Sequence, residues 1–191
     1  MNVAEEKRRK IVITGAPGTG KTVLVEGLEA QGFTCYHEII RTMTAEAKKQ
    51  GKKTAELTIN PLNFVEDPMA FNRMLLEGRL AHYETALKKR DAISFFDRGL
   101  PDVLAYMDYF EQEYPNEFLE TCDANRYDTI FIVPPWKEIY VSDNERLETY
   151  EQAEELHHHL VEAYQRFGYK LIMVPKTTIP ERIEFVLNNV T

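Results

Sequence analysis

The chain has little cysteine, and this limits the kind of protein that it can encode. Of its 191 residues only Cys35 and Cys122 are cysteines, too few for a disulfide framework, and they form no CxxC pair that would suggest a metal site. Long apolar runs are also missing, since none approaches the roughly 18 residues that a transmembrane helix needs. The first ten residues lack the apolar stretch of a secretory signal. We therefore expect a cytoplasmic protein with no membrane partner.

Positive charge is in deficit as well. The chain carries 31 acidic against 23 basic side chains, a formal net charge of −8. Proteins that follow a nucleic-acid backbone are normally basic, so no nucleic-acid partner is expected. A small anionic ligand is compatible with this charge, because a local site can override the net balance. Nothing in the pattern indicates the oligomeric state.

The apolar residues are arranged for one layered core. Neither repeats nor Ser/Gly-rich linkers divide the chain, so we predict a single domain over residues 1–191, with residues 1–9 as a frayed tail. Because the short apolar runs are continuous rather than alternating, they predict strands that are covered on both faces. This pattern predicts a doubly wound α/β fold with parallel strands. The predicted strands are residues 11–13, 33–37, 92–96, 129–133 and 171–174.

Local signals also predict two helices and an insertion. An aspartate followed by a proline, typical of a helix start, opens residues 67–90. Over residues 146–167 apolar side chains recur every three or four positions, and Gly168 is placed to end that helix. Glycine and proline interrupt residues 42–66 repeatedly, and we interpret this segment as a mobile insertion that covers a substrate.

The motif that carries the chemistry follows the first predicted strand. The letters GAPGTGKT match the phosphate-binding pattern G-x-x-x-x-G-K-[ST] in full. A strand before this loop and a helix after it let backbone N–H groups and the positive helix end converge on a phosphate. Lys21 would reach the β- and γ-phosphates, and Thr22 would bind the Mg²⁺ that bridges them. We therefore expect ATP and Mg²⁺ as cofactors, with the nucleotide held by Gly15, Ala16, Pro17, Gly18, Thr19, Gly20, Lys21 and Thr22.

Further polar candidates follow other predicted strands, whose carboxyl ends meet at one edge of a parallel sheet. Asp97 could hold Mg²⁺ or accept a proton from an attacking hydroxyl, the alternative being a turn or helix-capping aspartate. Arg98 beside it is expected on the transferred phosphoryl group. Glu38 and Arg41 would face the same crevice, unless both are ordinary surface residues.

Four more residues are candidates for contacts with the nucleotide. Arg146 could neutralise charge on the transferred phosphoryl group, as an arginine finger does, or pair with neighbouring glutamates on a helix surface. Lys176 and Thr177 follow the last predicted strand, where a loop commonly borders the purine base. Trp136 follows the fourth strand and either packs as a hinge or flanks the ligand. The catalytic candidates are thus Lys21, Glu38, Asp97, Arg98 and Arg146, and the metal candidates are Thr22 and Asp97.

Several spaced motifs resemble one known family. Besides the phosphate-binding loop they are DRGLPD from Asp97, RYD from Arg126, PPW ending at Trp136, DNER at residues 143–146, and the closing GYK and VP segments. From residue 10 to about residue 187, the chain resembles the AAA-type predicted ATPase family. That family is similar to the kinase domain of bacterial nicotinamide-riboside kinase regulators.

The resemblance implies a P-loop NTPase fold of the nucleoside- and nucleotide-kinase type. This is a three-layer sandwich, with helices on both faces of a parallel five-stranded sheet in the order 2-3-1-4-5 and a kinase-like lid over ATP. In related kinases the base is a carboxylate after the second strand or in the DR motif, which implies Glu38 or Asp97 here.

The sequence as a whole predicts an ATP-binding protein, and the leading interpretation is a Mg²⁺-ATP-dependent phosphotransferase. Such a kinase or ATPase would act on a small metabolite, such as a nucleoside or nucleotide. The alternative is a nucleotide-dependent switch that hydrolyses ATP or GTP slowly and binds a protein partner. The chain has no N-K-x-D motif, which argues against a Ras-type GTPase.

Overall fold

A parallel five-stranded sheet forms the middle layer of the protein, seen in a computed structural model that describes residues 8–40, 67–89, 91–140 and 148–190. Neighbouring strands pair in the order β2-β3-β1-β4-β5, and every pair is parallel. The fold class and the strand order implied by the resemblance are therefore confirmed. The strands are β1 (Arg9–Gly15), β2 (Thr34–Tyr36), β3 (Ile93–Asp97), β4 (Thr129–Val133) and β5 (Leu171–Met173).

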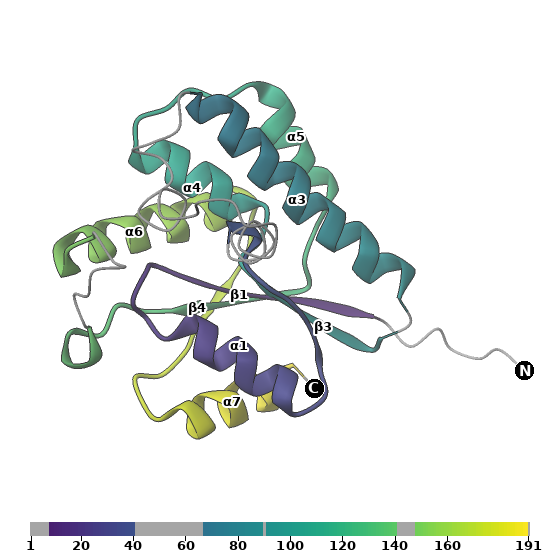
Figure 1. Ribbon diagram of the computed structural model, residues 1–191, viewed down its shortest axis with the longest axis vertical. Coiled ribbons are helices and arrows are strands. Elements are labelled where there is room, and N and C mark those ends of the chain that lie inside the picture. The colour runs from purple at the N-terminus through teal and green to yellow at the C-terminus, as the bar shows by residue number, and fades with distance from the viewer. Residues whose placement is uncertain (1–7, 41–66, 90, 141–147, 191) are drawn as a thin grey trace, which may run out of the picture.

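Helices cover both faces of this sheet (Figure 1). One layer contains α1 (Lys21–Ala30) and α7 (Ile179–Asn188). The other contains α3 (Pro68–Lys88), α4 (Pro101–Tyr109), α5 (Asn116–Ala124) and α6 (Tyr150–Arg166), and a short 3₁₀ turn, Lys137–Ile139, follows β4. Together the three layers reproduce the expected sandwich.

Successive side chains of β1 point alternately to the two helix layers, so the strand contributes to the core on both faces of the sheet. Ile11 and Ile13 pack with Leu24 and other side chains of α1 and α7, whereas Val12 packs with the opposite layer, which includes Leu104 of α4. All of these side chains are buried. Because both faces of the central strand are covered, its sequence is a continuous apolar run, as the sequence pattern predicted.

Capping decides where the two predicted helices begin. The side chain of Asp67 accepts a hydrogen bond from the Ala70 backbone N–H at 3.0 Å, and α3 starts directly after it as predicted. The start predicted for the other helix at residue 146 was wrong. Thr149 and Gln152 form a capping box, so α6 begins at Tyr150. Gly168 ends it in the left-handed conformation, at φ 75°.

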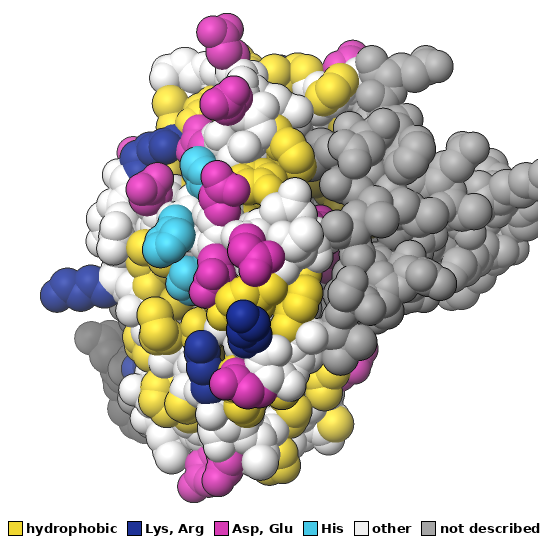
Figure 2. Space-filling model, turned by 90° about the vertical axis from the view of Figure 1, so that its left-hand side faces the viewer, with side chains coloured by type: hydrophobic (Ala, Val, Ile, Leu, Met, Phe, Trp, Pro, Cys, Tyr) yellow, Lys and Arg dark blue, Asp and Glu magenta, His cyan; other side chains and the backbone are white. Residues whose placement is uncertain are grey.

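The surface of the described residues is mixed in character. The face shown in Figure 2 has acidic, basic, histidine and apolar side chains interspersed, rather than one large patch of a single charge. Among the residues that the structure describes, no helix combines the length and the apolar character that a bilayer crossing requires.

Candidate functional site

The phosphate-binding loop runs from the end of β1 to the start of α1, as the sequence predicted. Gly18 and Gly20 have φ values of 78° and 80°, a left-handed conformation that glycine adopts without steric cost. The Thr19 hydroxyl donates to the Ala16 carbonyl oxygen at 3.0 Å and braces the loop from within. Backbone N–H groups of such a loop can surround a phosphate next to a positive helix end.

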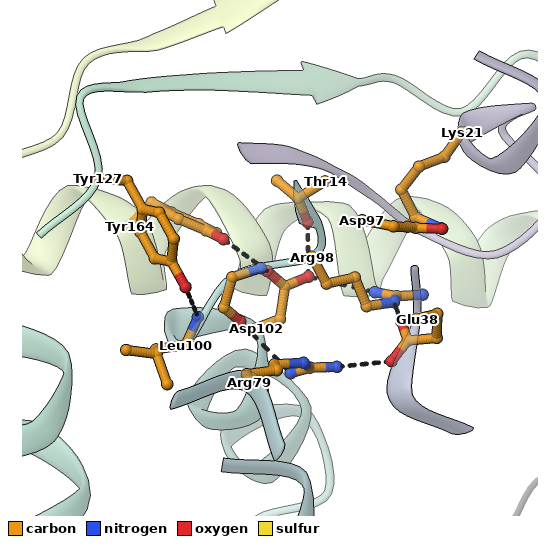
Figure 3. Close-up of polar contacts among 11 residues, drawn as sticks. Thr14, Lys21, Glu38, Arg79, Asp97, Arg98, Leu100, Asp102, Tyr127 and Tyr164 are labelled. Atoms are coloured by element: carbon orange, nitrogen blue, oxygen red, sulfur yellow. Dashed lines mark hydrogen bonds and ion pairs between the residues drawn. The ribbon is translucent and has the colours of Figure 1, made fainter. Parts of the chain in front are cut away.

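Lys21 and Asp97, two residues singled out from sequence, meet at this loop. β1 and β3 are hydrogen-bonded neighbours with Ile13 opposite Asp97, so the end of β3 lies beside the loop. The Lys21 Nζ and the Asp97 Oδ1 are 3.2 Å apart, and both side chains are buried (Figure 3). Burial lowers the pKa of Lys21, and the nearby carboxylate of Asp97 opposes this shift.

Glu38 is held between two arginines rather than exposed on the surface. Its Oε1 accepts a hydrogen bond from Arg79 Nη2 at 3.1 Å, and its other oxygen is ion-paired with Arg98 (Figure 3). Burial alone would raise the pKa of Glu38, but Arg79, Arg98 and Lys21 outweigh it and hold the pKa at about 2. Glu38 is therefore a carboxylate throughout the neutral range.

Asp102 organises the backbone beside Arg98 and was not singled out from the sequence. This fully buried carboxylate accepts from the Thr14 hydroxyl at 2.6 Å, the Gly99 N–H at 2.9 Å, the Arg98 Nη1 at 3.2 Å and the Tyr164 hydroxyl at 2.6 Å. Burial and the adjacent carboxylate raise the pKa of Tyr164 well above its ordinary value, so its hydroxyl keeps the proton that it donates.

Arg98 adopts a left-handed backbone conformation, with φ 76°, that is unusual for a residue with a side chain. In this conformation its side chain lies between Glu38 and Asp102 (Figure 3), and its guanidinium is 5.1 Å from the Tyr106 ring centroid. Such conformations persist only where surrounding contacts fix them, and they cluster at functional sites. The arrangement thus marks Arg98 as a constrained part of the cluster.

Arg79 is the second member of the cluster that sequence reasoning missed. Its side chain is buried, and besides Glu38 it contacts the Gly99 carbonyl oxygen at 3.4 Å. A signal was present in the sequence, because Arg79 lies on the apolar stripe of its helix between Leu75 and Tyr83, where an unpaired charge would be costly. A charged residue in such a position requires a buried partner.

The remaining sequence candidates lie elsewhere or outside the described residues. Lys176 is exposed, and the Thr177 hydroxyl is hydrogen-bonded to Glu181 in the first turn of α7, so a contact of either with a base stays a prediction. Trp136 packs against Arg182. Arg41, Arg146 and the insertion at residues 42–66 lie outside the described residues.

The residues at the loop fit a magnesium ion. Among the described residues, the buried Asp97 Oδ1 is ion-paired with Lys21 and has no hydrogen bond of normal geometry. Thr22 is the next residue along the helix from Lys21 and carries a hydroxyl oxygen. One carboxylate and one hydroxyl are suitable ligands, because Mg²⁺ in nucleotide sites takes few protein oxygens and completes its shell with phosphates and water.

Fold and loop together define a P-loop protein with the architecture of nucleotide kinases. Residues 10–182 match the AAA domain family, and the chain belongs to that family. The resemblance recognised in the sequence is thereby confirmed. No curated protein sequence matches the chain significantly.

Three solved structures illustrate the likeness of fold. Thymidylate kinase from Ehrlichia chaffeensis is 14% identical with a TM-score of 0.64, covering 97% of this chain and 100% of that one. Deoxyadenosine kinase from M. mycoides with bound dATP is 17% identical with a TM-score of 0.64, covering 96% and 99%. NadR protein in complex with NR is 19% identical with a TM-score of 0.68. That match covers 97% of this chain and 51% of NadR, so the chain spans about half of that protein.

Proposed function

We propose that the protein is a Mg²⁺-ATP-dependent phosphotransferase that transfers the γ-phosphoryl group to a small metabolite. The observation that carries this proposal is the clustering of the phosphate-binding lysine, Lys21, with Asp97, Glu38 and Arg98 at one edge of the sheet. Phosphoryl transfer depends mainly on positioning and charge stabilisation, and this cluster supplies fixed charges of both signs next to the loop. The acceptor class that we propose is a nucleoside or nucleotide.

On the nucleotide side, the loop N–H groups and Lys21 would bind the phosphates. Thr22 and Asp97 would hold Mg²⁺, which would neutralise charge that develops on the phosphates. Burial strengthens the attraction between Lys21 and an incoming phosphate, because the surrounding dielectric is low. Arg98 carries a second fixed positive charge toward the transferred group.

On the acceptor side, Glu38 is the carboxylate that we propose orients the attacking hydroxyl. Asp97 is ion-paired with Lys21, whereas Glu38 follows β2 and its side chain lies between Arg79 and Arg98. A carboxylate with a pKa of about 2 is a weak base. It therefore suits hydrogen bonding to a hydroxyl whose proton leaves late, as expected for a loose phosphoryl-transfer transition state.

The fold neighbours support the choice of acceptor class. Two of the three structures compared are of kinases whose names specify a nucleotide or nucleoside, and the third was solved with NR. The predicted roles of Arg146, of a lid and of the insertion at residues 42–66 complete the proposal. They would bring a further positive charge to the phosphates and exclude water from the acceptor.

The deciding experiment is Mg²⁺-dependent ADP release by the purified chain, alone and with a panel of nucleosides, nucleotides and ribosides. Mass spectrometry would detect the phosphorylated acceptor. We expect one acceptor class to stimulate turnover, Lys21→Met to reduce it at least a hundredfold, and Lys88→Met, an exposed lysine of α3, to leave it unchanged. Tight ATP binding with slow turnover that no acceptor stimulates would overturn the phosphotransferase in favour of the nucleotide-dependent switch.

A further inference from the structure

Arg182, in the first turn of α7, is a buried cation with no carboxylate partner in the part of the chain that the structure describes. The residue is 1% exposed, and among the residues that the structure describes it forms no ion pair. Its Nε atom is buried and has no hydrogen-bond partner there either. Buried charges are normally paired, so this arginine requires an explanation.

The position of Arg182 in its helix adds to the cost. The N-terminal end of a helix carries partial positive charge, which disfavours a cation in the first turn. Burial lowers the pKa of Arg182, but an arginine side chain stays protonated in proteins. The protein therefore keeps a positive charge where burial and the helix dipole both oppose it.

The guanidinium of Arg182 contacts the phosphate-binding loop and Trp136. Its Nη1 donates to the Thr19 carbonyl oxygen at 3.0 Å. A Cβ atom placed on Gly20 would lie 3.3 Å from the same nitrogen, so the guanidinium packs closely against this part of the loop. The guanidinium is also 5.2 Å from the ring centroid of Trp136.

The hydrogen bond to Thr19 fixes one peptide group of the loop. In a planar trans peptide the C=O and the following N–H point in opposite directions. Because Arg182 binds the Thr19 carbonyl oxygen from the side of α7, the N–H of Gly20 points away from α7. A cation on the carbonyl also polarises the peptide, which makes that N–H a stronger donor.

We propose that Arg182 is a positioning residue that strengthens phosphate binding by orienting and polarising the Thr19–Gly20 peptide, while its own charge adds to the attraction for the polyphosphate. This inference rests on the proposed nucleotide site and deepens it. It explains why a cation without a carboxylate partner in the described residues is buried behind the loop, since the nucleotide's phosphates supply the missing negative charge.

The proposal is tested with two ligands, ATP, which contains a base, and tripolyphosphate, which does not. The dissociation constants of Mg²⁺-ATP and of Mg²⁺-tripolyphosphate would be measured calorimetrically for the wild type, Arg182→Met and Arg182→Lys. Arg126→Met is the matched control, because Arg126 also lies over an aromatic ring, that of Tyr169, and donates to a backbone carbonyl oxygen, that of Phe167, at the opposite end of β4. Thermal unfolding would verify that each variant is folded.

We expect Arg182→Met to weaken the binding of both ligands at least tenfold and by a similar factor. Arg182→Lys should weaken their binding less, and the control should change neither dissociation constant more than twofold. Weakening of ATP alone would assign Arg182 to the base and overturn the proposal, as would unchanged affinity for both ligands. If Arg182→Met does not fold, Arg182→Gln takes its place with the same expected result.

The outcome also separates this inference from the proposed function. Arg182-dependent ATP binding without acceptor-stimulated turnover would overturn only the phosphotransferase. Acceptor-stimulated turnover with affinities that do not depend on Arg182 would overturn only the inference. A wild type that binds neither ATP nor tripolyphosphate would overturn both.

Discussion

Lys21 of the phosphate-binding loop and Asp97 at the end of β3 form a buried ion pair, with 3.2 Å between Nζ and Oδ1. Each charge is removed from water, and each supplies the other with the counter-charge that burial requires. The pair therefore holds the lysine at the loop before any nucleotide binds. An incoming phosphate would share Lys21 with Asp97, whose carboxylate would then be available to Mg²⁺ under the proposed function.

The first prediction concerns the stability of this pair. Lys21→Met leaves the Asp97 carboxylate buried and unpaired, so we expect the free energy of unfolding to fall by about 3 kcal/mol. Asp97→Asn should cost a similar amount, because it leaves the lysine unpaired. The double variant should lose clearly less than the sum of the two. Urea denaturation of the four proteins measures this coupling, and strictly additive losses would show that the two charges do not stabilise each other.

The second prediction concerns acid stability and Glu38. Its pKa falls from an ordinary value of 4.5 to about 2 in the folded protein, so the unfolded chain takes up the proton first. The stabilisation is complete above pH 4.5 and is lost as the pH falls through about 2. The shift corresponds to about 3 kcal/mol, falling to roughly half of that at pH 3.

Glu38→Gln imitates the protonated form, so the difference in unfolding free energy between wild type and variant should shrink as the pH falls from 6 to 3. Urea denaturation at several pH values measures it. Glu117→Gln is the control, because Glu117 is paired with Arg73 on the exposed surface and should give a small difference at both pH values. A difference for Glu38→Gln that does not change with pH would contradict the depressed pKa.

The third prediction concerns the space at Gly99. A Cβ atom there would lie 2.6 Å from the Tyr164 hydroxyl oxygen and 3.1 Å from both Tyr127 and Val12. Gly99→Ala should therefore destabilise the protein by about 2 kcal/mol through overpacking. Tyr164→Phe removes the nearest atom together with one hydrogen bond to Asp102. We expect the double variant to be more stable than the sum of the two single losses of unfolding free energy implies. A Gly99→Ala variant as stable as wild type would be incompatible with the packing described.

The fourth prediction concerns the magnesium ligand proposed from the loop sequence. Thr22→Val keeps the shape of the side chain but removes its hydroxyl oxygen. We expect the Mg²⁺ concentration that gives half-maximal ATP turnover to rise at least tenfold, while ATP binding in the presence of EDTA changes less than twofold. Thr85→Val, on the exposed face of α3, should change neither quantity. Equal Mg²⁺ dependence in Thr22→Val and wild type would remove Thr22 from the metal site.

The parts of this protein that could be predicted from sequence are those specified by local patterns. Continuous apolar runs predict four of the five strands, because a strand covered on both faces needs apolar side chains at successive positions, and the remaining strand, β2, lies within the predicted residues 33–37. The GAPGTGKT letters locate the loop, because its tight turns need glycine at fixed positions. The start of α6 was misplaced, because the prediction did not use the capping box of Thr149 and Gln152, which places the first helical residue at Tyr150.

The pairing of the charged residues became visible only in the folded chain. Arg79, Asp102 and Arg182 are buried at the site, and each has a partner that is distant in the chain and is brought to it by strand order and helix packing. These partners are Glu38, Tyr164 and Thr19, respectively. A buried charge is tolerated only where the fold supplies an opposite charge or a hydrogen-bond acceptor, and no local pattern encodes which residue that is. Local patterns in the amino-acid sequence thus specify the phosphate-binding loop and the strands of the sheet, whereas the packing of the folded chain specifies which charges face that loop.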